Sequence, residues 1–193
     1  MAQEPPANST QIVLDNFERE ELGKGWAVQT GEWKIQAGAL QAKENPADHH
    51  SAAARYVVET SDAVYQLNFE LSEGTKAFHF GFDPVPGELD KKGHLFSVIV
   101  TATGWKLMKH LDKNHPKEDP NEVLSEVSHP FEAGRVYTMR VTTWGPTVKA
   151  TIEGSAPLTG SHPTFSVRKP TLVFRVVGDT VMIDDLSVWA ASN

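Results

Sequence analysis

The stretch at residues 77–83 (AFHFGFD) limits the folds that this chain can adopt more than any other stretch does. Its three phenylalanines occupy alternate positions, so in an extended chain their rings all point to the same side. Three large rings on one side indicate a strand whose inner face packs in the core of a two-layer structure. The opposite side carries His79 and Asp83 with a glycine between them, which is the composition of a binding surface.

Other segments show the same period of two and are separated by turn residues. Residues 64–71 alternate as cleanly as the first stretch, and hairpins are expected at residues 33–40, 136–153 and 172–189. No segment sustains a helical apolar pattern, and residues 118–127 supply one short helix at most. About a dozen short strands predict an all-β, two-sheet antiparallel sandwich in which the first and last strands pair. The side chains predicted to face inward include Tyr65, Leu67, Phe69, Phe78, Phe80, Phe82, Phe174 and Ile183.

Length and composition limit the remaining possibilities. The 193 residues are expected to form one domain at residues 12–190, preceded by a flexible tail at residues 1–11 that is rich in Pro, Ser, Asn and Gln. The absence of cysteine excludes disulfides and thiolate chemistry. No apolar run approaches the roughly 20 residues of a transmembrane helix. A net charge of -7, with Lys and Arg scattered singly, argues against nucleic acid as a partner.

The first residues bear on the compartment. Residues 1–11 lack the apolar segment of an intact signal peptide. Ala2-Gln3 resembles what remains after a signal peptidase has cut, which predicts a periplasmic or extracellular protein. A natural cytoplasmic start is the alternative.

Several strand-end signatures resemble those of a known superfamily. They are DNFE (15–18), GW (25–26), GEW (31–33), GAL (38–40) and VMIDDLSV (181–188). Together they resemble the concanavalin A-like lectin/glucanase jelly rolls. Within that superfamily the chain is most similar to the bacterial 3-keto-disaccharide hydrolase domain, a former domain of unknown function whose members are often described as glycosyl hydrolases. The resemblance spans nearly all of residues 12–190 and implies a jelly roll that holds a sugar on its concave sheet.

The carboxylate pattern of one enzyme group in this superfamily is missing. Family 16 glycoside hydrolases carry Glu-x-Asp-x-x-Glu, and a retaining mechanism needs two carboxyl groups about 5–5.5 Å apart. Glu18-Arg-Glu20 has a related spacing, but it lies at the end of the first expected strand, where a solvated turn is the better interpretation. Asp83 and Glu70 can still converge from separate strands, so hydrolysis by another arrangement stays open. A Ser-His-Asp triad has no support, because the sequence lacks Gly-x-Ser-x-Gly.

Eight histidines raise the question of a metal. His79 and Asp83 share a face, but residues four apart on a strand lie about 13 Å apart, too far to bind one ion together. His79 with His49 or His50 from another segment is a conceivable zinc set. The alternative is that these imidazoles are surface or hydrogen-bonded groups.

Arg175 and Trp105 complete the candidate site. Arg175 projects from the outer face of an otherwise apolar strand, and a guanidinium in mid-sheet needs an acceptor such as Asp83 or Glu70. A simple ion pair on the sheet is as good an interpretation as sugar binding. Trp105 is the preferred aromatic side chain to stack on a sugar ring, with core packing as the alternative. The candidate sugar-binding residues are therefore His79, Asp83, Arg175, Glu70 and Trp105.

A structural calcium ion is a further prediction. Carbohydrate-binding jelly rolls that this opening and ending resemble often hold calcium between their first and last strands. The resemblance implies oxygen ligands from Asp15, Glu18 and Asp184. The alternative is that these carboxylates accept backbone hydrogen bonds at strand ends and bind nothing. No other cofactor is expected.

Two hypotheses for the function follow. The first is a carbohydrate-binding or carbohydrate-processing jelly roll with its site around His79, Asp83 and Arg175. The second is a non-catalytic structural or interaction domain of an exported protein, whose polar sheet face only meets solvent. A groove on the polar face favours the first hypothesis, whereas a flat face packed by loops favours the second.

Overall fold

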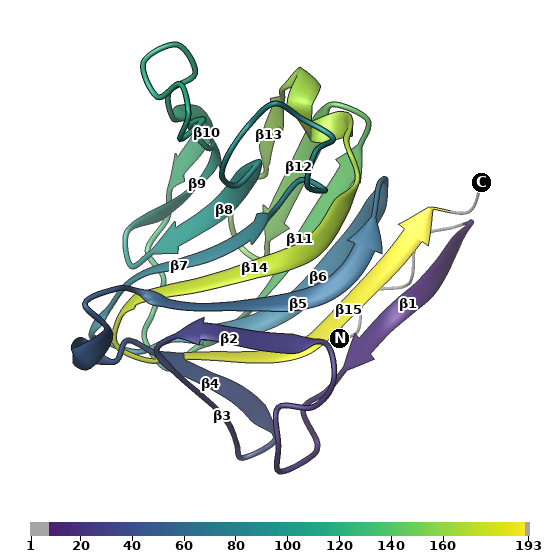
Figure 1. Cartoon of the computed structure of the whole chain (residues 1–193). Coiled ribbons are helices and arrows are strands. Elements are labelled where there is room, and N and C mark those ends of the chain that lie inside the picture. Colours follow the sequence, from purple (N-terminus) through teal and green to yellow (C-terminus); the bar gives the residue numbers. More distant parts are fainter. Residues whose placement is uncertain (1–7, 192–193) are drawn as a thin grey trace.

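Two antiparallel sheets face each other in a computed structural model that describes residues 8–191 (Figure 1). In spatial order the seven-stranded sheet contains β10 (Glu122–Ser128), β9 (Gly104–Lys109), β8 (Phe96–Thr101), β7 (Thr75–Phe82), β14 (Lys169–Gly178), β5 (Ala52–Thr60) and β2 (Trp26–Thr30). The eight-stranded sheet contains β13 (Leu158–Ser161), β12 (Thr147–Ile152), β11 (Val136–Trp144), β6 (Ala63–Leu71), β15 (Val181–Ala191), β4 (Ala39–Lys43) and β3 (Glu32–Gln36), with β1 (Ser9–Asp15) also paired to β15. The helices described are two 3₁₀ turns, η1 (Pro46–Asp48) and η2 (Pro163–Ser166). The predicted all-β jelly-roll sandwich is confirmed.

The core lies between the sheets and is rich in aromatic rings. Phe80 on β7 is 1% exposed, and its ring lies 5.3 Å from that of Phe174 on the neighbouring strand and 6.2 Å from that of Tyr65 on the opposite sheet. Alternation on each strand directs one side chain in two toward this layer, which is why the period of two located it correctly. All the side chains predicted to face inward are buried, namely Tyr65, Leu67, Phe69, Phe78, Phe80, Phe82, Phe174 and Ile183.

Two predicted hairpins are present and the third is wrong. Residues 32–43 turn at Ala37 and Gly38, which both have positive φ (53° and 75°), as a tight two-residue turn requires. The strands β11 and β12 also pair as predicted. However, β14 and β15 belong to different sheets, so the chain crosses the sandwich after Gly178. Residues 122–128 form strand β10, so the short helix considered for residues 118–127 is not formed there. Turn residues show that the chain reverses, but which sheet the next strand joins depends on its partners elsewhere in the chain.

The chain ends meet as predicted, because β1 pairs with β15. Strand β1 begins at Ser9, so the flexible tail predicted at residues 1–11 is wrong for residues 9–11. Of the remaining residues of that prediction, Asn8 lies in a turn just before β1, and residues 1–7 lie outside the described residues. Within residues 8–191, no helix is long and apolar enough to cross a bilayer.

Candidate functional site

The outer face of the seven-stranded sheet carries a row of side chains that crosses four strands. Strand pairing places Arg175 of β14 opposite His79 of β7, His79 opposite Ile99 of β8, and Ile99 opposite Lys106 of β9. Directly opposite residues point to the same face. Because adjacent strands are about 4.8 Å apart, the row spans roughly 14 Å.

Asp83, just beyond the end of β7, is the centre of a polar cluster on this face. Its Oδ2 accepts hydrogen bonds from Arg55 Nε at 2.7 Å and Thr171 Oγ1 at 3.2 Å, and its Oδ1 lies 2.5 Å from His94 Nδ1. Burial by itself would raise the pKa of Asp83, but the bonds and charges of His94 and Arg55 outweigh it and hold that pKa below its ordinary value. Asp83 is therefore an ionised carboxylate in a fixed orientation.

Two imidazoles on the same face are neutral at physiological pH. Burial, followed by the charges of Arg175 and His94, lowers the pKa of His79 to about 4. Burial and the neighbouring imidazoles lower the pKa of His110 to about 3. His110 Nε2 lies 2.7 Å from Ser97 Oγ, whereas Nδ1 of His79 is buried without a hydrogen-bond partner.

Gly81 makes room for this arrangement. A Cβ atom at Gly81 would lie 2.3 Å from Ser97 Oγ and 3.0 Å from the carbonyl oxygen of Phe96. The absence of a side chain at Gly81 therefore allows the neighbouring strand β8 to pack closely against β7. It leaves Ser97 free to bond His110.

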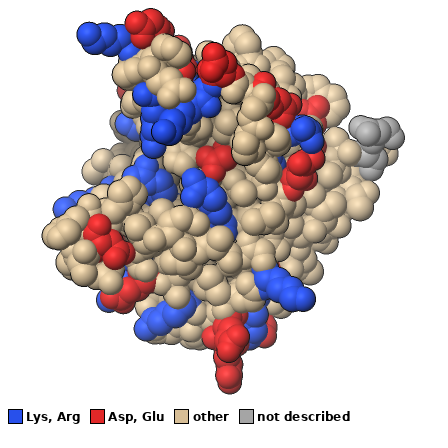
Figure 2. Space-filling model, in the orientation of Figure 1, with Lys and Arg blue, Asp and Glu red and all other residues tan. Residues whose placement is uncertain are grey.

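A cavity of about 720 Å³ opens on this face beside the Asp83 cluster. Its walls come from strands β2, β5 and β14 and from loops that include His50 and Pro84. In Figure 2, several Lys and Arg side chains lie together in the indentation between the upper and lower-left parts of the molecule. The charged side chains of its lining are Arg55, Asp83, Lys91, Lys92, Lys113 and Arg175.

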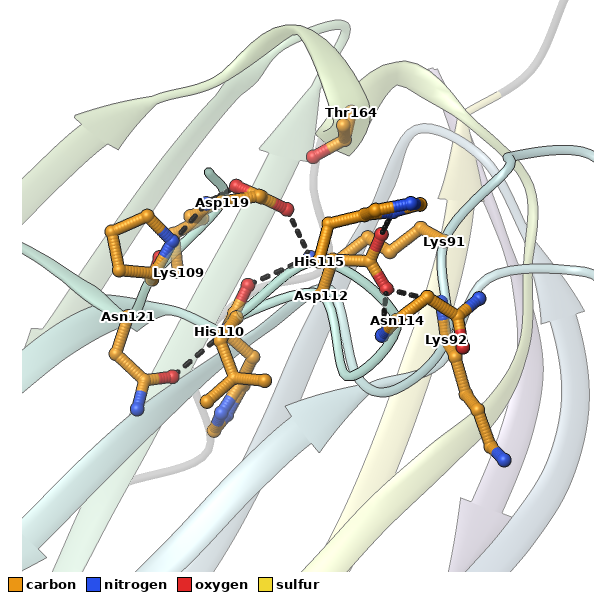
Figure 3. Close-up of polar contacts among 12 residues, drawn as sticks. Lys91, Lys92, Lys109, His110, Asp112, Asn114, His115, Asp119, Asn121 and Thr164 are labelled. Carbon is orange, nitrogen blue, oxygen red and sulfur yellow. Dashed lines mark hydrogen bonds and ion pairs between the residues drawn. The ribbon is translucent and has the colours of Figure 1, made fainter. Parts of the chain in front are cut away.

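Two loops beside this cavity are tied together by polar contacts (Figure 3). The Lys91 ammonium donates to the carbonyl oxygen of His110 at 2.8 Å and to Asp119 Oδ2 at 2.7 Å. The Asp112 carboxylate accepts from the backbone N–H groups of Lys92 and Asn114 at 3.0 and 2.8 Å. These contacts hold one wall of the cavity without any regular secondary structure.

The structure brings together three of the five candidate residues. His79, Asp83 and Arg175 share the outer face of one sheet. Glu70 lies on β6 in the other sheet, so its proposed convergence with Asp83 is wrong. Trp105 is 2% exposed and donates its indole N–H to Ser155 Oγ, so it packs in the core and cannot stack on a ligand.

The acceptor predicted for Arg175 is also wrong. Its guanidinium donates to Ser51 Oγ at 2.8 and 3.3 Å, while Asp83 is occupied by Arg55. As for a zinc set, no group of three His, Cys, Asp or Glu side chains within residues 8–191 is arranged to hold a metal ion.

The predicted calcium ligands are already engaged with other groups. Asp15 accepts from the Arg19 guanidinium at 2.5 and 2.9 Å and from Trp26 Nε1 at 3.0 Å. Asp184 accepts from the backbone N–H of Asp185 at 2.7 Å. These contacts agree with the alternative that the carboxylates at strand ends accept hydrogen bonds from the chain itself. Burial raises the pKa of Asp184, and the nearby charges of Glu18 and Asp15 add to that rise.

Calcium dependence can be measured directly. Because Asp15 is neutralised by Arg19, we expect thermal unfolding curves in calcium and in chelator to coincide. An ion that binds only the folded chain would raise the midpoint. A calcium-dependent rise that disappears in Asp184→Asn would establish the ion predicted from the resemblance.

Several residues of the site were missed by sequence reasoning. They are Arg55, His94 and the Ser97–His110 pair, which lie on strands and loops outside residues 77–83. Alternation places His110 and Trp105 on opposite faces of the sheet, but it leaves open which face is the outer one, so the sequence did not determine the orientation of His110. Its proximity to His79 depends on strand order, which the sequence does not show.

The facing antiparallel sheets define an all-β jelly-roll sandwich. No protein-family model and no curated protein matches the sequence.

Several solved structures share the fold. The carbohydrate-binding module CBM66 from Bacillus subtilis is 17% identical with a TM-score of 0.65, covering 84% of this chain and 93% of its own. The family GH16 endo-β-1,3(4)-glucanase SCLam is 10% identical with a TM-score of 0.73, covering 98% and 94%. A GlcNAcα1-4Gal-releasing endo-β-galactosidase from Clostridium perfringens is 11% identical with a TM-score of 0.72, covering 98% and 65%. At these identities the similarity shows the fold.

Proposed function

We propose that this domain binds carbohydrate in the cavity on the outer face of the seven-stranded sheet. The observation that carries the proposal is the Asp83 cluster at the cavity wall, where a carboxylate, a guanidinium and an imidazole are held in fixed orientations. Sugar hydroxyl groups both donate and accept, and ionised partners make the stronger hydrogen bonds. A carbohydrate-binding module and two glycanases with the same fold support this proposal.

The geometry favours an extended ligand. A second hollow of about 470 Å³ lies on the same sheet and is lined by Ile99, Lys106 and Glu126. The row from Arg175 through His79 connects the first cavity to this hollow. An oligosaccharide lying across the strands would contact both, whereas a single sugar unit would fill only one.

Binding is better supported than hydrolysis. A two-carboxylate mechanism needs a protonated acid with a raised pKa beside a second carboxylate. Asp83 is the one carboxylate in the described lining of the main cavity, and its pKa is lowered. The alternative of a purely structural domain lacks a specific observation in its favour, because the polar face is hollowed and not flat. Export to the periplasm or the cell exterior stays a prediction.

The test is binding of a polysaccharide panel by calorimetry and affinity electrophoresis, with laminarin, dextran, galactan, polygalacturonate and dextran sulfate as probes. For the probe that binds best, we expect Asp83→Asn to weaken affinity about tenfold or more, because the charge that orients Arg55 and His94 is lost. Asp179→Asn, at an exposed turn, is the matched control and should bind as wild type.

Two outcomes would reject the proposal. One is the absence of binding to every probe by the folded wild-type protein. The other is equal affinity in Asp83→Asn and in the control. Reducing-sugar release from the same probes measures hydrolysis in parallel.

A further inference from the structure

The main cavity has an excess of positive charge on an acidic chain. Five Lys and Arg side chains and one carboxylate line it, although the whole chain carries a formal charge of -7. Arg55 is paired with Asp83, and Lys91 with Asp119. The described structure gives no ion pair to the three remaining cations, Lys92, Lys113 and Arg175.

Arg175 is the most informative of these cations. Its guanidinium is half-buried on the sheet, and both of its side-chain hydrogen bonds go to one neutral hydroxyl, Ser51 Oγ. Burial lowers the pKa of Arg175, and no nearby carboxylate offsets that effect. A guanidinium has five N–H donors in a planar fork that matches an oxyanion, so donors remain for a ligand. Across the strand pair, His79 presents a buried Nδ1 that also lacks a partner.

The cavity is also poor in the groups that bind neutral sugars by stacking. Its lining contains no Trp, Tyr or Phe among the described residues, and its aromatic rings are those of His50 and His94. The most exposed tryptophan described, Trp144, is 68% exposed but lies on β11 of the other sheet. Recognition in this cavity must therefore depend on charge and hydrogen bonds.

We propose that the ligand is an acidic saccharide whose oxyanion contacts Arg175, with Lys92 and Lys113 supplying further positive charge. This inference rests on the proposed function and names its ligand class. A uronic acid carboxylate and a sugar sulfate share the required chemistry, namely a planar or tetrahedral group of oxygens that can accept two hydrogen bonds from one guanidinium. An anion would also supply the countercharge that Arg175 lacks among the described residues.

The first test compares polymers that share a backbone but differ in whether they carry anionic groups. Polygalacturonate is paired with its fully methyl-esterified form, and dextran sulfate with dextran. We expect the wild type to bind the acidic member of at least one pair about tenfold more tightly, with affinity falling as NaCl is raised, because salt screens partly exposed charges. Preference within the first pair identifies a carboxylate ligand, and preference within the second identifies a sulfate.

The second test locates the contact. Arg175→Gln should abolish the preference for the acidic polymer, and Arg175→Lys should restore only part of it, because an ammonium cannot form the two-pronged contact. Arg135→Gln removes an exposed arginine paired with Glu132 and is the matched control. If Arg175→Gln fails to fold, the double variant Lys92→Gln/Lys113→Gln should still weaken acidic binding several-fold.

Three results would overturn the inference. If neutral polymers bind as tightly as their acidic partners, the charge specificity is wrong while carbohydrate binding stands. If Arg135→Gln weakens acidic binding as much as Arg175→Gln, the attraction is diffuse and not located in the cavity. If no polymer binds, the proposed function fails as well.

Discussion

Replacing Phe80 with alanine is expected to lower the free energy of unfolding by about 3–5 kcal/mol. Phe80 is 1% exposed and lies on β7, a strand that is paired on both sides by β14 and β8. Its ring contacts those of Tyr65, Phe82 and Phe174 at centroid distances of 6.2, 5.2 and 5.3 Å. Removal of the ring leaves a cavity that rigid paired strands cannot fill. Urea unfolding monitored by circular dichroism measures the change.

The matched control removes an aromatic ring from the surface. Trp144 is 68% exposed, so Trp144→Ala should cost less than about 1 kcal/mol. A loss for Phe80→Ala no larger than that of the control would mean that the core does not depend on the rings of β7. It would also undermine the assignment of the opposite side of β7 to the binding face.

Acidification from pH 6.5 to pH 4 is expected to destabilise the protein strongly. The ordinary histidine pKa is 6.5, whereas the folded values are about 4 for His79 and about 3 for His110. Between these values the unfolded chain binds more protons than the folded chain. The two histidines therefore contribute no penalty to the free energy of unfolding above pH 6.5, and that free energy falls as the pH is lowered below 6.5. The loss is at most about 1.4 kcal/mol per pH unit for each histidine. The charges that face His79 are those of Arg175, His94 and Lys106, and they reinforce the effect of burial.

The pH window separates the histidines from the acids. Carboxylates with a lowered pKa, such as Asp83, lose their stabilising contribution only below about their ordinary value of 3.8. The double variant His79→Gln/His110→Gln should therefore show a flatter dependence of unfolding free energy on pH between 6.5 and 4. Equal slopes for wild type and variant, measured by urea unfolding at each pH, would show that these imidazoles do not titrate as the structure indicates.

The polar cluster shows where sequence reasoning reached its limit. Alternation put His79 and Asp83 on the face opposite the core, and the same rule put Arg175 on the outer face of its strand. Alternation did not show that Arg55 would form the ion pair with Asp83 or that Arg175 would donate to Ser51, because those contacts join segments far apart in the chain. Glu70 obeyed the alternation and pointed outward, yet it lies in the other sheet.

Trp105 illustrates the same limit for a single strand. Its position after a turn glycine suggested exposure, but Trp105 and Leu107 share the inward side of β9. The alternation within that segment predicted either face equally well, because both sides contain apolar residues. The choice depended on which side of β9 the eight-stranded sheet covers.

The sequence alone determined the all-β class, most of the strands and the inward faces of those strands that alternate cleanly, such as residues 64–71 and 77–82, since these follow from the local geometry of an extended chain and the burial of apolar side chains. Only the tertiary structure decided the order of strands in each sheet, the crossing from β14 to β15 and the assembly of the cationic cavity. The physical reason is that strand pairing joins backbone groups that are nearly identical from one strand to the next. Which strands become neighbours is therefore decided by packing over the whole sandwich, and the charged side chains on the outer face are brought together by that packing.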